Sequence, residues 1–150
     1  MDLPQRKKLP HNVPLWVDPQ REIYFITINC LCRGINRLAT PGIAEALLES
    51  VRLRNEQSIW FAHLFLFMPD HVHALLSFPP ARRTLKEIVR LWKRWSARQL
   101  GIQWQRDFFE HRLRSDEIYR EKADYILANP VRKGLVKEAK DWPYKFIPAR

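Results

Sequence analysis

The sequence lacks any hydrophobic run that approaches the roughly 20 apolar residues of a transmembrane helix. Its first residues include lysine and proline but no apolar stretch of the kind found in a signal peptide. Cysteine is scarce as well, with only Cys30 and Cys32. Because these two residues are one position apart on a predicted strand, their side chains point to opposite faces and cannot easily pair. We therefore expect a soluble protein of the reducing cytoplasm that needs no disulfide.

Acidic residues are also in short supply, with 16 Asp and Glu against 26 Lys and Arg, which gives a formal net charge of +10. A surplus of this size favours polyanionic partners, although it carries no information about the fold. The phosphate backbone of a nucleic acid is the first candidate partner. An anionic membrane surface would also suit the net charge, so the placement of the charges has to decide between the two.

The 150 residues, of which 46% are apolar, suit one compact domain. The sequence contains no internal repeat and no low-complexity segment. Residues 1–20 include four prolines and are predicted to form an extended N-terminal arm. Residues 21–150 are expected to fold as a single domain.

Hydrophobic spacing and turn residues divide this domain into strands and helices. The predicted strands are 22–32, 59–68, 71–78 and 107–113, and the predicted helices are 43–56, 84–99 and a third from Ser115 to about Asn129. This order matches a ferredoxin-like α+β sandwich, in which helices cover one face of an antiparallel sheet, with an extra helix near the C-terminus. Within the second strand, His63 alternates with Phe61 and Phe65, so we interpret it as a core or supporting histidine.

His71 and His73 follow a Pro-Asp turn at the start of a predicted strand. Side chains two apart on a strand share a face, so both imidazoles can converge on one ion while Val72 and Ala74 face the other way. The pattern His-x-His also arises by chance, and a structural role explains the pair as well. A closed zinc site would need two further strong ligands, and no Cys-x-x-Cys or second histidine pair offers them. An open metal site therefore fits the pair better than a structural one.

The third predicted helix places Tyr125 and Asn129 about one turn apart on a polar strip, away from the packing face that includes Tyr119 and Ile126. A half-exposed tyrosine and a helix-end asparagine explain this spacing without any chemistry. The catalytic interpretation is that a divalent cation on two imidazoles and one amide oxygen withdraws charge from a phosphodiester. The phenol of Tyr125 then forms a phosphotyrosine link that preserves the energy of the broken bond.

Four blocks of sequence are far more specific than His-x-His. They are M-P-D-H-V-H-A-L-L at 68–76, F-F-E-H-R-L-R at 108–114, D-Y-I-L-A-N-P-V-R-K-G-L-V at 124–136 and D-W-P-Y at 141–144. In this order and spacing they resemble the HUH-class single-tyrosine transposases that act on single-stranded DNA, most closely the REP-associated tyrosine transposases. The resemblance runs from about Tyr24 to Trp142. One departure is Asp70, which stands where the family commonly has asparagine.

The resemblance implies that His71 and His73 bind the metal, that Asn129 is the third, amide ligand, and that Tyr125 is the nucleophile. The implied reaction is cleavage of one DNA strand through a 5′-phosphotyrosine intermediate with a free 3′-hydroxyl, and the implied cofactor is Mg²⁺ or Mn²⁺. The implied partner is single-stranded or hairpin-forming DNA, and not a membrane. We expect the protein to act as a monomer or a homodimer.

Basic residues form a stripe on the second predicted helix, opposite an apolar arc that includes Ile88 and Trp92. Such a stripe can track a phosphate backbone, although a solvated basic face is the ordinary explanation for any single charge. The predicted DNA-binding residues are Arg82, Arg83, Lys86, Arg90, Lys93, Arg94, Arg98, Arg112, Arg114, Arg132 and Lys133.

Two other functions compete with this interpretation. A DNA- or RNA-hairpin-binding protein without catalysis would carry the same charge, and it would show salt-sensitive binding with no covalent product. A two-histidine phosphoesterase needs two separated His-x-Thr/Ser pairs, whereas His71 and His73 form a single cluster without that hydroxyl. The sequence therefore favours a nicking and joining enzyme, with the binding protein as the alternative.

Overall fold

The computed structural model describes residues 22–79 and 83–148. Its helices are α1 (Pro41–Glu56), α2 (Leu85–Leu100), α3 (Asp116–Leu127) and the short α4 (Asn129–Arg132), followed by a 3-10 turn at Ala139–Asp141. Its strands are β1 (Tyr24–Asn29), β2 (Phe61–Phe67), β3 (His71–Ser77), β4 (Phe109–Arg112) and β5 (Lys145–Phe146). The predicted N-terminal arm and Arg82 lie outside the described residues.

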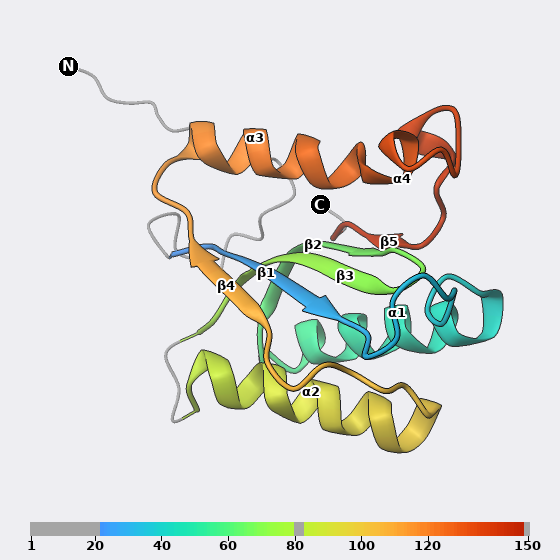
Figure 1. Cartoon of the computed structure of the whole chain (residues 1–150). Coiled ribbons are helices and arrows are strands. Elements are labelled where there is room, and N and C mark those ends of the chain that lie inside the picture. Colours follow the sequence, from blue (N-terminus) through green and yellow to red (C-terminus); the bar gives the residue numbers. More distant parts are fainter. Residues whose placement is uncertain (1–21, 80–82, 149–150) are drawn as a thin grey trace.

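The strands form one antiparallel sheet in the order β4-β1-β3-β2-β5 (Figure 1). The central strands β2 and β3 are buried along their whole length, which explains their near-continuous apolar sequences. The two-residue strand β5 pairs with β2 and was not predicted, because two residues give no periodicity to detect. The α+β architecture agrees with the predicted sandwich.

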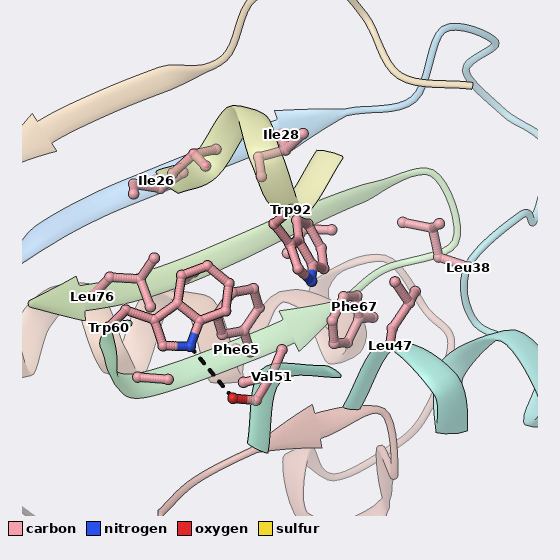
Figure 2. Packing of buried hydrophobic residues seen from close by; sticks show 14 of the residues in the cluster. Ile26, Ile28, Leu38, Leu47, Val51, Trp60, Phe65, Phe67, Leu76 and Trp92 are labelled. Atoms are coloured by element: carbon pink, nitrogen blue, oxygen red, sulfur yellow. Dashed lines mark hydrogen bonds between the residues drawn. The ribbon is translucent and has the colours of Figure 1, made fainter. Parts of the chain in front are cut away.

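Helices α1 and α2 cover one face of the sheet and enclose the larger hydrophobic core (Figure 1). Figure 2 shows Trp60, Phe65, Phe67 and Trp92 packed between these helices and the strands. The buried indole of Trp92 donates to the hydroxyl of Ser50 at 2.9 Å, so its polar atom is satisfied inside the core. Helix α2 begins with the predicted capping box, in which the side chain of Thr84 accepts from the backbone of Glu87 and the Glu87 carboxylate accepts in return.

Helix α3 is the predicted extra helix, and it lies on the opposite face of the sheet (Figure 1). A second hydrophobic cluster joins Tyr119 and Ile126 of α3 to Leu64 and Leu66 of β2 and to Leu75 of β3. The side chain of Ser115 caps the start of α3 by accepting from the backbone of Ile118. The sheet is therefore enclosed by helices on both faces, with α3 and the short α4 on the face that carries the two histidines (Figure 1).

Helix α3 ends at Leu127, near the Asn-Pro pair as predicted, but the chain remains helical through the corner that follows. Ala128 keeps right-handed helical dihedrals, and a new short helix, α4, starts at Asn129 with Pro130 in its first turn, where a missing N–H costs nothing. The resulting α3-α4 corner buries Asn129 and keeps it beside the sheet. Within the described residues no helix is both long and apolar enough to cross a membrane.

The position of His63 differs from the prediction in one respect. It is buried as expected, and its ring packs against Phe61 and Tyr119. However, the register between β2 and β3 shifts between Ala62 and Leu64, so the alternation is broken at this point. Phe65 consequently belongs to the core under α1 and α2, and not to the side that His63 faces.

Candidate metal and nucleophile site

The two histidines of β3 share one face of the sheet, as predicted. Their ring centroids are 4.8 Å apart, and the residues His71 and His73 are 7% and 9% exposed. Val72 and Ala74 point the other way into the core under α1 and α2. The alternation of the strand thus brings two imidazoles together on the face that α3 covers.

The orientation of His71 is fixed by the residue before it in the chain. Nδ1 of His71 lies 2.9 Å from a carboxylate oxygen of Asp70, and the other oxygen accepts from the backbone N–H of Gly34 and from Arg33. Burial alone would raise the pKa of Asp70, but these hydrogen bonds hold the pKa well below its usual range. An ionised carboxylate can only accept, so Nδ1 of His71 carries the proton and Nε2 keeps its lone pair.

His73 is held in a similar way by a hydroxyl. Its Nδ1 lies 3.0 Å from Oγ1 of Thr27 on the neighbouring strand β1. Burial lowers the pKa of His73 to about 3, and the neighbouring His71 and the guanidiniums of Arg132 and Arg33 lower it further. Burial also lowers the pKa of His71. Both imidazoles are therefore neutral at neutral pH, which is the form that binds a metal ion.

Asn129 brings a third polar group to the pair from the α3-α4 corner. Its side chain is 4% exposed, and its amide nitrogen lies 3.4 Å from Nε2 of His71. Rotation of the terminal amide brings its oxygen to the same side. Within residues 22–79 and 83–148 no group of three or more His, Cys, Asp or Glu side chains is placed to hold an ion. The available donor set is thus two imidazole nitrogens and one amide oxygen, which fits an open metal site.

Tyr125 lies one turn before Asn129 on α3, and its side chain is 52% exposed. The guanidinium carbon of Arg132, on α4, is 4.0 Å from the centroid of its ring. Tyr119 differs from Tyr125. It is buried against His63, and burial raises the pKa of its phenol to about 12. Of these two tyrosines of α3, only Tyr125 presents its ring to solvent.

Several residues around the histidines were not predicted as site residues. Phe25 of β1 packs against His73 with 5.5 Å between ring centroids, and the ammonium of Lys122 lies 5.3 Å from the Phe25 centroid. Arg33 and Thr27 approach through β1 and the loop after it. No local sequence pattern reveals them, since each depends on the pairing of β1 with β3.

The predicted DNA-binding residues lie on both faces of the sheet and at the end of its edge strand β4 (Figure 1). Arg132 and Lys133 lie near the histidines, where their positive charges lower the imidazole pKa values. The exposed cations of α2 lie on the other face, and they are Lys86, Arg90, Arg94 and Arg98, with Arg83 just before the helix. Arg112 and Arg114 are exposed at the end of β4, where Arg112 pairs with Glu22 at 2.7 Å.

Lys93 is an exception to the predicted basic stripe. It is buried, and its ammonium donates to the backbone carbonyls of Gln105 and Arg106 at 2.8 and 2.9 Å. The loop between α2 and β4 folds back over this side of the helix and takes up the charge. Lys93 therefore anchors the loop, and in this structure it is not free to bind phosphate as predicted.

The fold and the site can now be compared with known proteins. The chain is similar over 96% of its length to a REP-associated tyrosine transposase whose structure was solved with a REP hairpin, with a TM-score of 0.72 and 24% identity over 82% of that chain. It is also similar to a provisionally named transposase of Deinococcus radiodurans, with a TM-score of 0.53 and 20% identity, covering 81% of this chain and 95% of that one. At these identities the likeness concerns the fold.

Sequence comparison identifies the family. No model of a known protein family matches the chain. A Haemophilus influenzae protein given the provisional name REP-associated tyrosine transposase is 37% identical over 94 residues, which are 51% of this chain and 53% of that protein. The REP-associated tyrosine transposase of Escherichia coli K12 is 30% identical over 126 residues, which are 81% of this chain and 73% of that protein. On this similarity, the chain belongs to the family of REP-associated tyrosine transposases.

Proposed function

We propose that this protein cleaves and rejoins single-stranded DNA, with Tyr125 as the nucleophile and with a divalent metal ion held by His71, His73 and Asn129. The observation that carries the proposal is the juxtaposition of two buried, neutral imidazoles with a buried amide, one helical turn after an exposed tyrosine. Both imidazoles use Nδ1 for hydrogen bonds to Asp70 and Thr27, which leaves Nε2 of each for the ion.

The donor set fits Mg²⁺ or Mn²⁺, and two imidazole nitrogens suit Mn²⁺ better, because Mg²⁺ prefers oxygen ligands. When bound, the ion would withdraw charge from the scissile phosphate and fix its orientation. The protein's own contribution is to hold the ligands in place before the DNA arrives. The ion pair of Asp70 with Arg33 and the hydroxyl of Thr27 serve this purpose.

In the proposed step the phenolic oxygen of Tyr125 attacks the phosphorus, and the bond to the 3′-oxygen breaks. The phenol, whose ordinary pKa is near 10, loses its proton, and the departing 3′-oxygen gains one to become a hydroxyl. The 5′-phosphate remains joined to Tyr125. Attack by a 3′-hydroxyl on this phosphotyrosine reverses the step and reseals a strand, so no external energy source is needed.

Arg132 and Lys133 supply positive charge beside the nucleophile. The guanidinium of Arg132 stacks on the Tyr125 ring and so holds its orientation on the exposed side of α3. The edge of the same guanidinium is free to donate to phosphate oxygens, since no other partner of Arg132 is found among the described residues. This arrangement binds the attacked phosphate where charge accumulates during the reaction.

We further propose that the substrate contains a DNA hairpin next to the cleaved strand. Support comes from the relatives, which are named REP-associated tyrosine transposases, and from the structural neighbour, which was solved with a REP hairpin. The exposed cations of α2 provide a second phosphate-binding surface away from the site. One protein can thus hold a duplex stem while a single strand reaches the histidines.

The proposal is tested by incubating the protein with end-labelled hairpin DNA, carrying a single-stranded flank, and Mn²⁺. A protease-sensitive, slowly migrating adduct is expected with the native protein and not with Tyr125→Phe. Tyr119→Phe is the matched control and should still form the adduct. Tight, salt-sensitive binding with no adduct from the native protein would instead establish the alternative, a hairpin-binding protein without catalysis.

A further inference from the structure

Strand β4 presents an exposed aromatic side chain at the open edge of the sheet. All four residues of β4 are exposed, and the side chain of Phe109 is 73% exposed. A single exposed apolar residue is ordinary on a protein surface. The register of the sheet, however, places Phe109 in the same row as one of the proposed metal ligands.

Phe109 stands in the same row of the sheet as one of the proposed metal ligands. It lies directly opposite Thr27 of β1, and Thr27 lies directly opposite His73 of β3. Directly opposed residues of an antiparallel pair direct their side chains to the same face. With neighbouring strands about 4.8 Å apart, Phe109 begins about 10 Å from His73 on the same face of the sheet.

Within residues 22–79 and 83–148, this part of the face is exposed at β4. Helix α3 packs on β2 and β3 and reaches β1 at Phe25. Beyond Phe25, which carries Lys122 over its ring, the next strand outward bears only Phe109 and His111 on this face, and both are exposed. Among the described residues, the row from His73 through Thr27 to Phe109 therefore runs from the histidines to the exposed edge strand.

Positive charge lies on both sides of Phe109. A groove of about 360 Å³ runs between α2 and β4 and reaches Phe109. Its cations include Lys86, Arg90 and Arg106, with acidic side chains at Asp107 and Glu110. On the other side, Arg33 and Arg132 stand near the histidines. An extended polyanion that passes from the groove to the site would cross the edge of the sheet at Phe109.

We propose that Phe109 is a stacking platform for an unpaired base of the DNA strand that enters the site. The proposal rests on the proposed function, because it assumes that the scissile phosphate lies at the histidines. A phenyl ring accepts the face of any base, so the platform would hold the strand in place without reading its sequence. Phosphates on one side of the base would lie against the α2 groove and on the other side against Arg132.

The test is a double-mutant cycle between the protein and the DNA, carried out by equilibrium binding without divalent metal in the Tyr125→Phe background. Each unpaired nucleotide of a hairpin oligonucleotide is replaced in turn by an abasic one. One abasic position should weaken binding to the Phe109-containing protein by roughly 10- to 100-fold. Phe109→Ala should lose a similar factor with intact DNA, and it should show no further loss at that position.

Two control variants make the result specific. Phe109→Trp keeps a ring and should bind nearly as tightly, while Leu53→Ala removes an exposed apolar side chain on α1 and should change nothing. The proposal is overturned if Phe109→Ala binds DNA as tightly as its parent. It is also overturned if the loss of affinity caused by Phe109→Ala adds fully to the loss caused by every abasic position. The adduct assay is independent, because a missing adduct with an intact cycle refutes the cleavage chemistry and leaves the stacking platform standing.

Discussion

The guanidinium of Arg132 lies over the ring of Tyr125, with 4.0 Å between its central carbon and the ring centroid. The two residues are seven positions apart and come from α3 and α4, so the contact exists because the chain stays helical through Ala128 and restarts at Asn129. The same corner buries Asn129 against His71. About two turns of backbone thus place the proposed nucleophile, its cationic partner and the proposed amide ligand together.

Removal of the Arg132 charge should slow adduct formation. Arg132→Gln loses both the stacking on Tyr125 and a charge-assisted hydrogen bond to phosphate, which together predict a decrease of roughly 10- to 100-fold in the rate. The measurement is a single-turnover time course of adduct formation with excess protein. Lys140→Gln removes an exposed cation that pairs with Glu138 and should leave the rate unchanged; an equal decrease in both variants would contradict a specific role for Arg132.

Thr27 should influence metal binding without being a ligand. Thr27→Val keeps the shape of the side chain but removes the hydroxyl that holds Nδ1 of His73, so the imidazole loses its fixed orientation. The affinity for Mn²⁺ is expected to fall by roughly 10-fold or more, as for other residues that orient a metal ligand. The affinity is measured by titrating the protein with Mn²⁺ and following the free ion by electron paramagnetic resonance. Thr27→Ser should retain the affinity of the native protein, and an equal loss in both variants would count against the role of the hydroxyl.

Lys93 and Arg90 should behave differently although both belong to the basic side of α2. Lys93→Met leaves the carbonyls of Gln105 and Arg106 without their donor and should lower the free energy of unfolding by about 1–3 kcal/mol. Arg90→Gln should leave stability unchanged and reduce the slope of log affinity against log salt by about one. Urea denaturation and DNA binding at several salt concentrations separate the two. If Lys93→Met reduced the salt slope and left the free energy of unfolding unchanged, Lys93 would bind phosphate and would not anchor the loop.

The buried His63 should make stability depend on pH. Burial lowers its pKa to about 3, whereas in the unfolded chain the pKa is near 6.5, so only the unfolded state takes up a proton between these values. The stabilisation is complete above pH 6.5 and is lost as the pH falls toward 3, by up to about 1.4 kcal/mol per pH unit.

His63→Gln should reduce this slope by about one proton, measured as the difference between urea unfolding curves of the two proteins from pH 7 to pH 4. The comparison is necessary because burial lowers the pKa of His73 in the same direction, and its contribution remains in both proteins. Parallel pH profiles for the two proteins would show that His63 is not buried in its neutral form.

Local patterns in the sequence were sufficient for the helices, the long strands and the pairing of the two histidines on one face. The capping box at Thr84 and the alternation of β3 depend on residues within one element, and both were predicted. The burial of Lys93 was missed because a helical wheel does not include the loop that folds over the helix. The bulge in β2, which separates His63 from Phe65, leaves no mark in the apolar run.

The residues that orient the histidines could not be predicted because they depend on the register between strands, which the predicted fold does not fix. Thr27 reaches His73 only because β1 pairs with β3, and Arg33 reaches Asp70 only because the loop after β1 returns to the turn before β3. Phe109 joins the same row through the pairing of β4 with β1. The predicted ferredoxin-like fold implies which strands are neighbours, but local sequence patterns do not align individual residues across them.

The most direct test of the central claim is to identify the residue that becomes linked to DNA. The native protein is incubated with hairpin DNA and Mn²⁺, the DNA is digested with nuclease, and the protein is fragmented for mass spectrometry. The account predicts a nucleotide remnant on the peptide that contains Tyr125, attached to the phenolic oxygen through a 5′-phosphate. A remnant on Tyr119 or on any other residue, or cleaved DNA with no protein-linked nucleotide, would contradict it.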